Sequence, residues 1–235
     1  MTGAGRQVPT RPLGRESRRE RARAMRRADI VSAALEVFGE QGYDAATMDE
    51  IARRAEYTKR TLYAYFPSKL DLLLELIAQQ LGALIGELEA ALTDAVTGAE
   101  QLSVIAHVTL AWYRETPGLF DLMNLPSPLP PAAEERPGFA AARSCNDRLH
   151  RLIADAFIAG QADGTLRSGV DPELAALYAT SMTSGLLQTL QRHGPLFETL
   201  FGVAPEAFIG FALQMMGASF LANTSGLGAT PVKDR

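Results

Sequence analysis

The sequence contains few of the side chains with which enzymes and metal proteins usually work. It has one cysteine, Cys145, and three histidines, His107, His150 and His193. A single cysteine excludes a disulfide within one chain and any cysteine-rich zinc site. The histidines follow one another at intervals of 43 residues, and none has a histidine or carboxylate three or four residues further on, so no helical metal-binding pair is present. We therefore predict no metal site and no cofactor.

Sequence motifs of catalysis are also missing. There is no H-E-x-x-H zinc motif, no Walker loop and no G-x-S-x-G elbow. Cys145 stands close to Arg143 and Arg148, so it is either a reactive thiol or a buried small apolar residue. Without a catalytic motif, the sequence predicts a protein that is not an enzyme.

Long hydrophobic runs are absent as well. No apolar run reaches the roughly 18 residues that a membrane-spanning helix needs, and no hydrophobic segment of the signal-peptide kind follows the arginine-rich N-terminus. With 47% apolar and 21% charged residues, the composition is that of a globular protein. We expect a cytoplasmic protein with no membrane partner.

The charge of the chain is divided unevenly along its length. The formal net charge is −4, yet residues 1–70 hold 14 basic against 9 acidic residues, and residues 71–235 hold 9 basic against 18 acidic residues. Such asymmetry is typical of a protein whose basic end meets nucleic acid while an acidic remainder stays away from it.

The stretch from Thr47 to Lys69 predicts two short helices with a tight turn between them. The first helix is expected to begin with a capping box, in which Thr47 accepts a hydrogen bond from the Glu50 amide and the Glu50 side chain reaches back. Its apolar positions share one face that packs inward: Met48, Ile51, Ala52 and Ala55. The turn is Glu56-Tyr57.

Thr58 is expected to cap the second helix, whose buried positions Leu62 and Phe66 lie four residues apart on one stripe. The outward positions combine cations, hydroxyls and phenols without a carboxylate: Thr58, Lys59, Arg60, Thr61, Tyr63 and Tyr65. Such groups bond phosphates and guanine or pack on the methyl group of thymine. The pattern predicts a helix-turn-helix that binds DNA, although any two amphipathic helices in an all-α protein share its apolar spacing.

The run T-x-x-x-I-A-x-x-A-x-x-T-x-x-T-L-Y-x-Y-F-x-S-K, residues 47–69, resembles the N-terminal DNA-binding domain of the TetR family of transcriptional regulators. The resemblance covers about residues 25–80. It implies phosphate contacts from Thr47, Thr58, Lys59, Tyr65 and Lys69, and base contacts from Lys59, Arg60, Thr61 and Tyr63. The family usually has glycine where this chain has Glu56. That residue therefore either accepts a left-handed conformation, at a cost of about 1–2 kcal/mol, or changes the turn.

We divide the chain into four parts and expect an all-α fold. Residues 1–20, with Pro9, Pro12 and several arginines, are predicted to be a disordered basic arm that either lies on DNA or stays solvated. Residues 21–67 form a three-helix, helix-turn-helix DNA-binding domain, with a scaffold helix from Arg21 to Gly42. Residues 68–222 form a helical effector-binding and dimerisation domain, and residues 223–235 a flexible tail.

In the second domain, Ser68 and Asp71 are expected to cap a helix that runs to about Leu92. Further helices are predicted near 99–116 and 138–160, with at most a short helical piece at 118–125 between them. Two long apolar helices, about 172–192 and 205–222, complete the fold.

A group of aromatic, sulfur and polar side chains in this domain has two interpretations: ordinary core, or the lining of a small-molecule pocket between helices. The predicted pocket residues are His107, Trp112, Tyr113, Phe120, Met123, Asn124 and Cys145. The resemblance implies an effector site, because C-terminal domains of the family commonly bind effectors. The predicted ligand is a small apolar or aromatic molecule.

The helices at 172–192 and 205–222 are more apolar than one short chain can cover, which favours a homodimer with a four-helix interface. We predict an interface that contains Leu174, Tyr178, Met182, Leu186, Phe208, Phe211 and Met215. A membrane-surface helix is the rival interpretation of 205–222, but this segment has no lysine or arginine.

Together, these patterns predict a ligand-responsive repressor that binds a palindromic operator in double-stranded DNA as a homodimer. The alternative is a helical ligand-binding or carrier protein whose helix-turn-helix does not read DNA.

Overall fold

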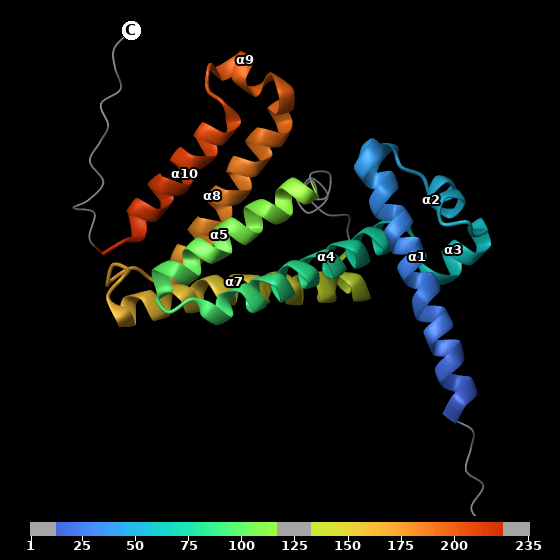
Figure 1. Ribbon diagram of the computed structural model, residues 1–235. Helices are drawn as coiled ribbons and strands as arrows, with labels where there is room; N and C mark the ends of the chain where they lie inside the picture. The colour runs from blue at the N-terminus through green and yellow to red at the C-terminus, as the bar shows by residue number, and fades with distance from the viewer. Residues whose placement is uncertain (1–12, 117–132, 223–235) are drawn as a thin grey trace, which may run out of the picture.

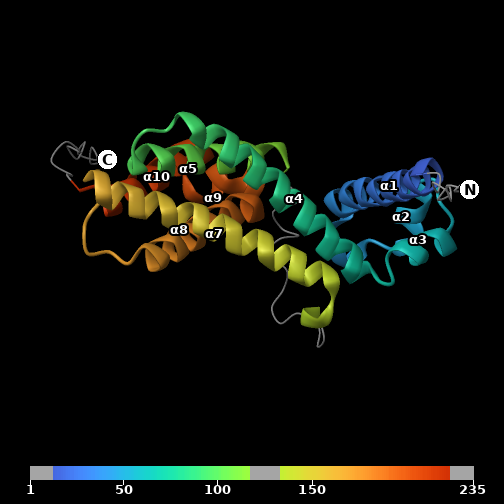
Figure 2. The same ribbon diagram turned by 90° about the horizontal axis from the view of Figure 1, so that it is seen from below.

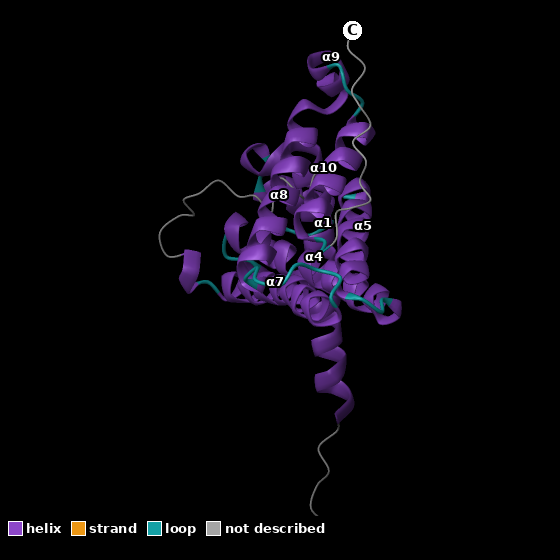
Figure 3. Cartoon of the chain, turned by 90° about the vertical axis from the view of Figure 1, so that its left-hand side faces the viewer, coloured by secondary structure: helices purple, strands orange, loops and turns teal. Residues whose placement is uncertain are grey.

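The computed structural model describes residues 13–116 and 133–222, and over these ranges the chain folds into α-helices joined by turns and short loops (Figures 1 and 3). The predicted all-α class is confirmed. The short helical piece expected at 118–125 lies outside the described residues. None of the described helices is both long and apolar enough to cross a membrane.

Three helices form the N-terminal bundle: α1 (Leu13–Ala45), α2 (Met48–Arg54) and α3 (Lys59–Tyr65). Their shared core consists of Ile30, Ala34, Val37, Phe38, Ile51, Leu62 and Phe66, all at most 1% exposed. Gly42, at φ 79° and ψ 165°, interrupts α1 where the sequence predicted its end. A positive φ favours glycine because it has no Cβ.

The predicted disordered arm is wrong for residues 13–20, which belong to α1, while residues 1–12 lie outside the described part of the chain. From residue 13 to residue 29 the sequence has no proline and is rich in arginine, alanine and glutamate, which are strong helix formers. The first half of α1 therefore continues past α2 and α3 as a projecting helix (Figure 1).

Threonine side chains cap both short helices as predicted. Thr47 accepts from the amide of Glu50 at 3.2 Å, and Thr58 accepts from the amide of Thr61 at 3.1 Å. The reciprocal half of the predicted capping box is wrong, because the Glu50 carboxylate instead accepts a 2.8 Å hydrogen bond from Gln41 of α1. That bond ties α2 to α1.

Glu56 adopts φ 58° in the turn between α2 and α3, so the structure takes the left-handed alternative. The amides of Glu56 and Tyr57 donate to carbonyls of α2, at 3.2 and 2.9 Å, which closes the turn. The Tyr57 hydroxyl also donates to Asp29 of α1 at 2.8 Å. These bonds help to offset the roughly 1–2 kcal/mol that a left-handed conformation costs a residue with a Cβ.

The long helix α4 (Lys69–Ala91) leaves this bundle and enters the second part of the molecule (Figure 2). Ser68 caps it by accepting from the Asp71 amide at 3.2 Å, as predicted. Beside α4 lie α5 (Gly98–Glu115), which follows the 3₁₀ turn η1 (Leu92–Asp94), and α7 (Pro137–Asp163), which follows η2 (Ala133–Glu135). The start of α5 crosses α7 so closely that a Cβ on Gly98 would lie 2.1 Å from the backbone nitrogen of Gly160.

A helical arm completes the fold and rises away from α4 and α7 (Figure 1). It consists of α8 (Pro172–His193), η3 (Gly194–Leu196), α9 (Phe197–Phe201) and α10 (Pro205–Phe220). The base of the arm is anchored by Phe220, whose ring contacts Phe157 of α7 and Tyr178 of α8 at centroid distances of 4.7 and 5.7 Å. These helices lie within a few residues of the predicted ranges.

Candidate nucleic-acid interface and ligand cavity

Helix α3 turns a polar surface outward because two large residues hold its other side in the bundle. Leu62 and Phe66 are 0% and 1% exposed. Thr58, Lys59, Arg60 and Tyr63 are exposed, whereas Thr61 and Tyr65 are half-buried. All six predicted outward positions therefore retain some access to solvent.

Lys59 forms an ion pair with Asp49 of α2 that the sequence pattern does not indicate. Its ammonium lies 2.7 Å from Asp49 of α2, and both side chains are largely exposed. The hydrogen bond with Asp49 raises the pKa of Lys59. By contrast, the Arg60 guanidinium has no ion-pair or hydrogen-bond partner among the residues that the structure describes. Arg60 is thus the free cation of α3, whereas Lys59 is paired with Asp49 at the surface.

The threonine hydroxyls of this region use their oxygens within the protein and keep protons to donate. Thr58 Oγ1 accepts from the Thr61 amide and lies 2.9 Å from Thr61 Oγ1, so one of the two hydroxyls donates to the other. The second proton remains available, and so does that of Thr47, whose oxygen accepts from Glu50. Hydroxyl donors in this arrangement suit phosphate oxygens.

Lys69 lies in a different environment from the one that the resemblance implies. Its Nζ donates to the carbonyl oxygens of Tyr43, Asp44 and Ala46, at 2.6, 3.2 and 2.9 Å, and lies 4.4 Å from the centroid of the Tyr43 ring. A lysine ammonium has three protons, so these bonds engage all of them. The side chain binds the carbonyls at the end of α1, which a cation stabilises.

A shallow polar hollow brings several predicted contacts together. It lies between the start of α2 and the outer side of α3 and is lined by Ala46, Thr47, Met48, Asp49, Lys59, Tyr63, Pro67, Ser68 and Lys69. Arg60, Thr61, Thr58 and Tyr65 lie outside it. The predicted phosphate contacts thus fall into two groups. Thr47, Lys59 and Lys69 line the hollow, whereas Thr58 and Tyr65 lie outside it.

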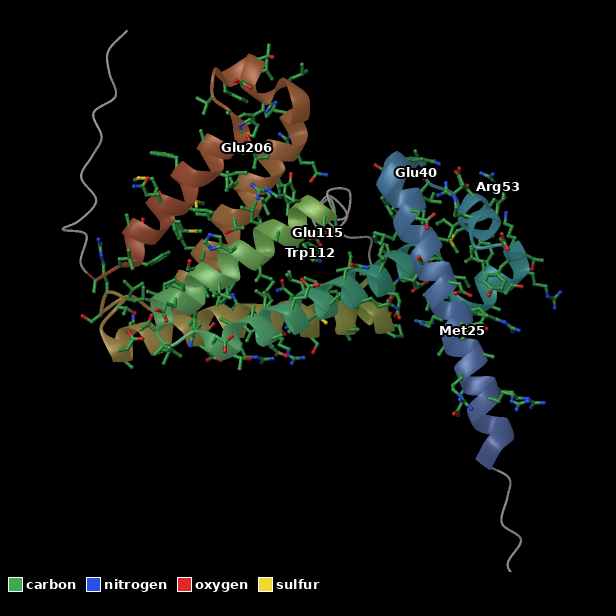
Figure 4. All side chains as sticks on the ribbon, viewed as in Figure 1. Met25, Glu40, Arg53, Trp112, Glu115 and Glu206 are labelled. Atoms are coloured by element: carbon green, nitrogen blue, oxygen red, sulfur yellow. The ribbon has the colours of Figure 1, made fainter. Side chains whose placement is uncertain are left out.

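A second basic group occupies the projecting half of α1. The side chains of Arg18, Arg19, Arg21, Arg23 and Arg26 are exposed along it. Figure 4 marks this stretch with Met25, a residue that is 67% exposed, and places Arg53 at the far side of the bundle. The exposed arginines of α1 give the bundle a second positive surface, separate from that of α3.

Two ion pairs join α4 to its neighbours at the boundary between the two parts of the molecule. Arg27 of α1 donates to both carboxylate oxygens of Glu75, at 3.1 and 2.9 Å, and these bonds lower the pKa of Glu75. Arg136, at the start of α7, donates to Ser68 and Asp71, at 2.9 and 2.6 Å. Burial raises the pKa of Asp71, but the hydrogen bonds from Ser68 and Arg136 outweigh it and leave the pKa below its ordinary value.

A cavity of about 430 Å³ lies among α4, α5, α7, α8 and α10. Its walls are mainly apolar, with Leu81, Leu84, Leu102, Ile105, Trp112, Leu149, Ile153, Phe157, Leu213, Met216 and Phe220 among them. Its polar wall residues are Ser103, His107, Thr109, Asn146, Thr180, Thr183 and Ser184. Volumes of about 300–1,000 Å³ with a mainly apolar lining are typical of small-molecule sites.

The structure separates the predicted pocket residues into three sets. His107 and Trp112 line the cavity, and Trp112, labelled on α5 in Figure 4, is 5% exposed. Tyr113 and Cys145 do not line it: the Tyr113 hydroxyl donates to the Leu187 carbonyl, and the Cys145 thiol lies 3.5 Å from the Ala78 carbonyl. Phe120, Met123 and Asn124 lie outside the described residues.

Most of the cavity wall, notably the threonines and the serine of α8, was not predicted from the sequence. Thr180, Thr183 and Ser184 recur at the spacing of one helix face, but their direction depends on how α8 packs on α5 and α7. Among the described residues, no group of three or more histidine, cysteine or acidic side chains is placed to hold a metal ion.

The predicted interface residues lie on α8 and α10, and most of them face solvent. Leu174, Tyr178, Met182, Phe211 and Met215 are between 45% and 66% exposed, whereas Leu186 and Phe208 are half-buried. One chain therefore leaves an apolar surface on both helices uncovered. Large exposed apolar patches mark interaction sites.

Residues 30–76 match the family model described as bacterial regulatory proteins, tetR family. Over 100 residues the chain is 39% identical to the HTH-type transcriptional activator FasR of Mycolicibacterium smegmatis, a match that covers 42% of this chain and 46% of FasR. Over 152 residues it is 26% identical to the HTH-type transcriptional repressor KstR of Mycobacterium tuberculosis, covering 65% of this chain and 63% of KstR. The chain thus matches less than two thirds of the length of either relative.

The fold is also found in solved structures. A transcriptional regulator from Saccharomonospora viridis, in complex with choline, superposes with a TM-score of 0.70 and 19% sequence identity, covering 85% of this chain and 100% of that regulator. At this identity the likeness concerns the fold.

Proposed function

We propose that the chain, whose residues 30–76 match the tetR-family model, is a homodimeric TetR-family repressor released from its operator by a small-molecule effector. The relatives include both activators and repressors of transcription, since FasR is named an activator and KstR a repressor. The match with KstR extends over more of this chain, which supports repression.

The observation that carries the proposal is the outer side of α3. It combines the free guanidinium of Arg60, the ammonium of Lys59 and the hydroxyls of Thr58 and Thr61, on a helix held by two buried residues. In the major groove an arginine binds guanine O6 and N7 with two hydrogen bonds, while lysine and threonine bind phosphates. We assign base reading to Arg60, Thr61 and Tyr63, with Lys59 shared between bases and backbone.

Thr47, Thr58 and Tyr65 remain proposed phosphate contacts, because each stands at an edge of the helix-turn-helix with access to solvent. Lys69 leaves this set in the present arrangement, since its ammonium is engaged by three carbonyl oxygens. We assign it a structural role.

The dimer is supported by the uncovered apolar residues of α8 and α10, which a second copy would cover in a four-helix interface. Two-fold symmetry would present two α3 helices to a palindromic operator, with half-sites about 34 Å apart. An effector would act on that spacing. The cavity wall includes Leu81 and Leu84 of α4, whose first turns are joined to α1 by the Arg27–Glu75 pair.

The first prediction tests base reading with the arginine of α3. Arg60→Ala should cost about 1–3 kcal/mol of binding to the operator and relax the preference at one base pair, since a bidentate contact with guanine is lost. The measurement is a gel-shift titration with DNA from upstream of the gene and with a set of single base-pair variants. Arg143→Ala, on the exposed side of α7, is the control and should bind as the unaltered protein does.

Equal losses on specific and random DNA would remove Arg60 from the base-reading set. If the unaltered protein prefers no DNA sequence, the carrier-protein alternative replaces the regulator.

A further inference from the structure

The chemistry of the cavity wall restricts the kind of effector that can occupy it, an inference that rests on the effector role proposed above. All 24 lining residues are uncharged or imidazole side chains, with no lysine, arginine, aspartate or glutamate among the described residues of the wall. A buried carboxylate or phosphate would find no cation there.

The wall nevertheless offers hydrogen bonds. The hydroxyls of Thr109, Thr183 and Ser184 are half-buried on the wall and have no partner among the described residues. The hydroxyl of Thr180 donates to the Ala176 carbonyl at 2.9 Å, which leaves its oxygen free to accept. A hydroxyl both donates and accepts, so these groups suit an alcohol or a carbonyl oxygen of a ligand.

His107 adds an acceptor of defined orientation. Its Nδ1 lies 2.7 Å from the backbone carbonyl of Ser103, and a carbonyl can only accept, so Nδ1 carries the proton. In the neutral imidazole the other nitrogen, Nε2, is then an acceptor, and no described residue donates to it. A ligand hydroxyl could donate there.

We propose that the effector is an uncharged molecule with an extended hydrocarbon body and one or two hydroxyl or carbonyl oxygens, and not a carboxylate, a phosphate ester or an ammonium ion. The apolar walls take the hydrocarbon, and the half-buried hydroxyls of Thr109, Thr180, Thr183 and Ser184 take the oxygens, while His107 is a wall residue that is itself exposed to solvent. A charged group in the same place would lose its hydration without an opposite charge to replace it, which costs several kcal/mol.

The test is a series of three probes with the same chain length and different end groups. Decanol, decanoate and decyltrimethylammonium are titrated at pH 7.5, below their micelle concentrations, into the full-length dimer or monomer as purified. A change in the fluorescence emission of Trp112, the single tryptophan, reports occupancy of the cavity, and calorimetry measures affinity. Decanol should bind at least about tenfold more tightly than either charged probe. Equal or tighter binding of a charged probe, or no saturable binding of decanol, overturns the proposal.

A matched pair of variants tests whether decanol binds inside the cavity. Ala179→Phe fills the cavity from α8 and should abolish decanol binding, while Ala162→Phe, the same change on the exposed side of α7, should leave it unchanged. If Ala179→Phe does not fold, Thr183→Val removes one wall hydroxyl at nearly constant volume and should weaken decanol severalfold. Decanol that binds but leaves operator affinity unchanged would keep the ligand class and remove the effector role. Decanoate that binds more tightly than decanol and lowers operator affinity would keep the effector role and remove the ligand class.

Discussion

At the scale of single residues, the two lysines near the helix-turn-helix illustrate how partners decide a role. Lys59 is exposed and holds Asp49 through one ion pair, which a phosphate could replace. Lys69 is half-buried, packs on the ring of Tyr43 and donates to three backbone carbonyls at the end of α1. The same functional group is thus exposed in a single surface ion pair in one place and engaged by the backbone of the fold in the other.

Replacing each lysine by alanine should separate these roles. Lys69→Ala removes the donor from half-buried carbonyls and should lower the free energy of unfolding by about 1–3 kcal/mol. Lys59→Ala should leave that free energy nearly unchanged and lower the slope of log K against log salt by about 0.9, the value for one lost phosphate contact. Urea unfolding and salt-dependent gel shifts measure the two quantities.

The assignment of Lys69 would be refuted by an unchanged unfolding midpoint together with a salt slope reduced by one. In that case the ammonium leaves the carbonyls on DNA and makes the phosphate contact that the resemblance implied.

At the scale of elements, α4 is the link between the DNA-binding bundle and the cavity. The Arg27–Glu75 pair fixes it to α1, and Arg136 holds its N-cap residue Ser68 and the carboxylate of Asp71. Figure 2 shows that α4 is the helix that spans the two parts. A movement of α4 would therefore disturb these pairs as well as its apolar packing against α1.

The Arg27–Glu75 pair should make stability depend on pH in a defined direction. Its hydrogen bonds lower the folded-state pKa of Glu75, so its contribution is complete above the ordinary glutamate pKa of about 4.3 and is lost as the pH falls through the lowered value. Glu75→Gln should thus cost about 1 kcal/mol at pH 7, a discounted value because the pair is partly exposed, and progressively less below about pH 4.

Denaturant unfolding of both proteins between pH 3 and 7 measures this difference. Glu87→Gln, an exposed change on the same helix, serves as control and should differ little from the unaltered protein at any pH. A loss of unfolding free energy that is constant across the pH range would show that packing of the Glu75 side chain, rather than its charge, holds α4 against α1.

At the scale of the whole molecule, the arm of α8 and α10 is the part that one chain leaves uncovered. Met182 and Phe211 are 48% and 59% exposed, and their apolar neighbours on both helices share that exposure. In contrast, the core at the base of the arm is closed by Phe157 and Phe220. Exposure is thus concentrated where the sequence predicted a partner chain.

Met182→Glu and Phe211→Glu should each produce a folded monomer with weak operator binding. Both positions are exposed in the single chain but buried in the proposed dimer. Leu186 is a less suitable position for this test, because it is half-buried within its own chain and a glutamate there would also disturb folding. Sedimentation velocity measures the assembly and circular dichroism the helix content. Val96→Glu, at a position 86% exposed before α5, is the control and should remain dimeric. A stable dimer carrying either glutamate would place the interface elsewhere.

By itself, the sequence determined the features that depend on residues three or four positions apart. The caps at Thr47, Thr58 and Ser68 and the burial of Leu62 and Phe66 follow from helix geometry, which is the same in every fold. The limits of α4, α5, α7, α8 and α10 followed in the same way from periodicity and from breaking residues.

Only the tertiary structure decided which partners residues far apart along the chain would find. The carbonyls that engage Lys69 lie 23–26 residues before it, and the pair of Arg27 and Glu75 spans 48 residues. Trp112 lines the cavity while its neighbour Tyr113 donates to the Leu187 carbonyl of α8, because adjacent residues on a helix point about 100° apart. Which of the two directions meets a cavity depends on the packing of α5 against α4, α7 and α8, and local sequence does not encode that angle.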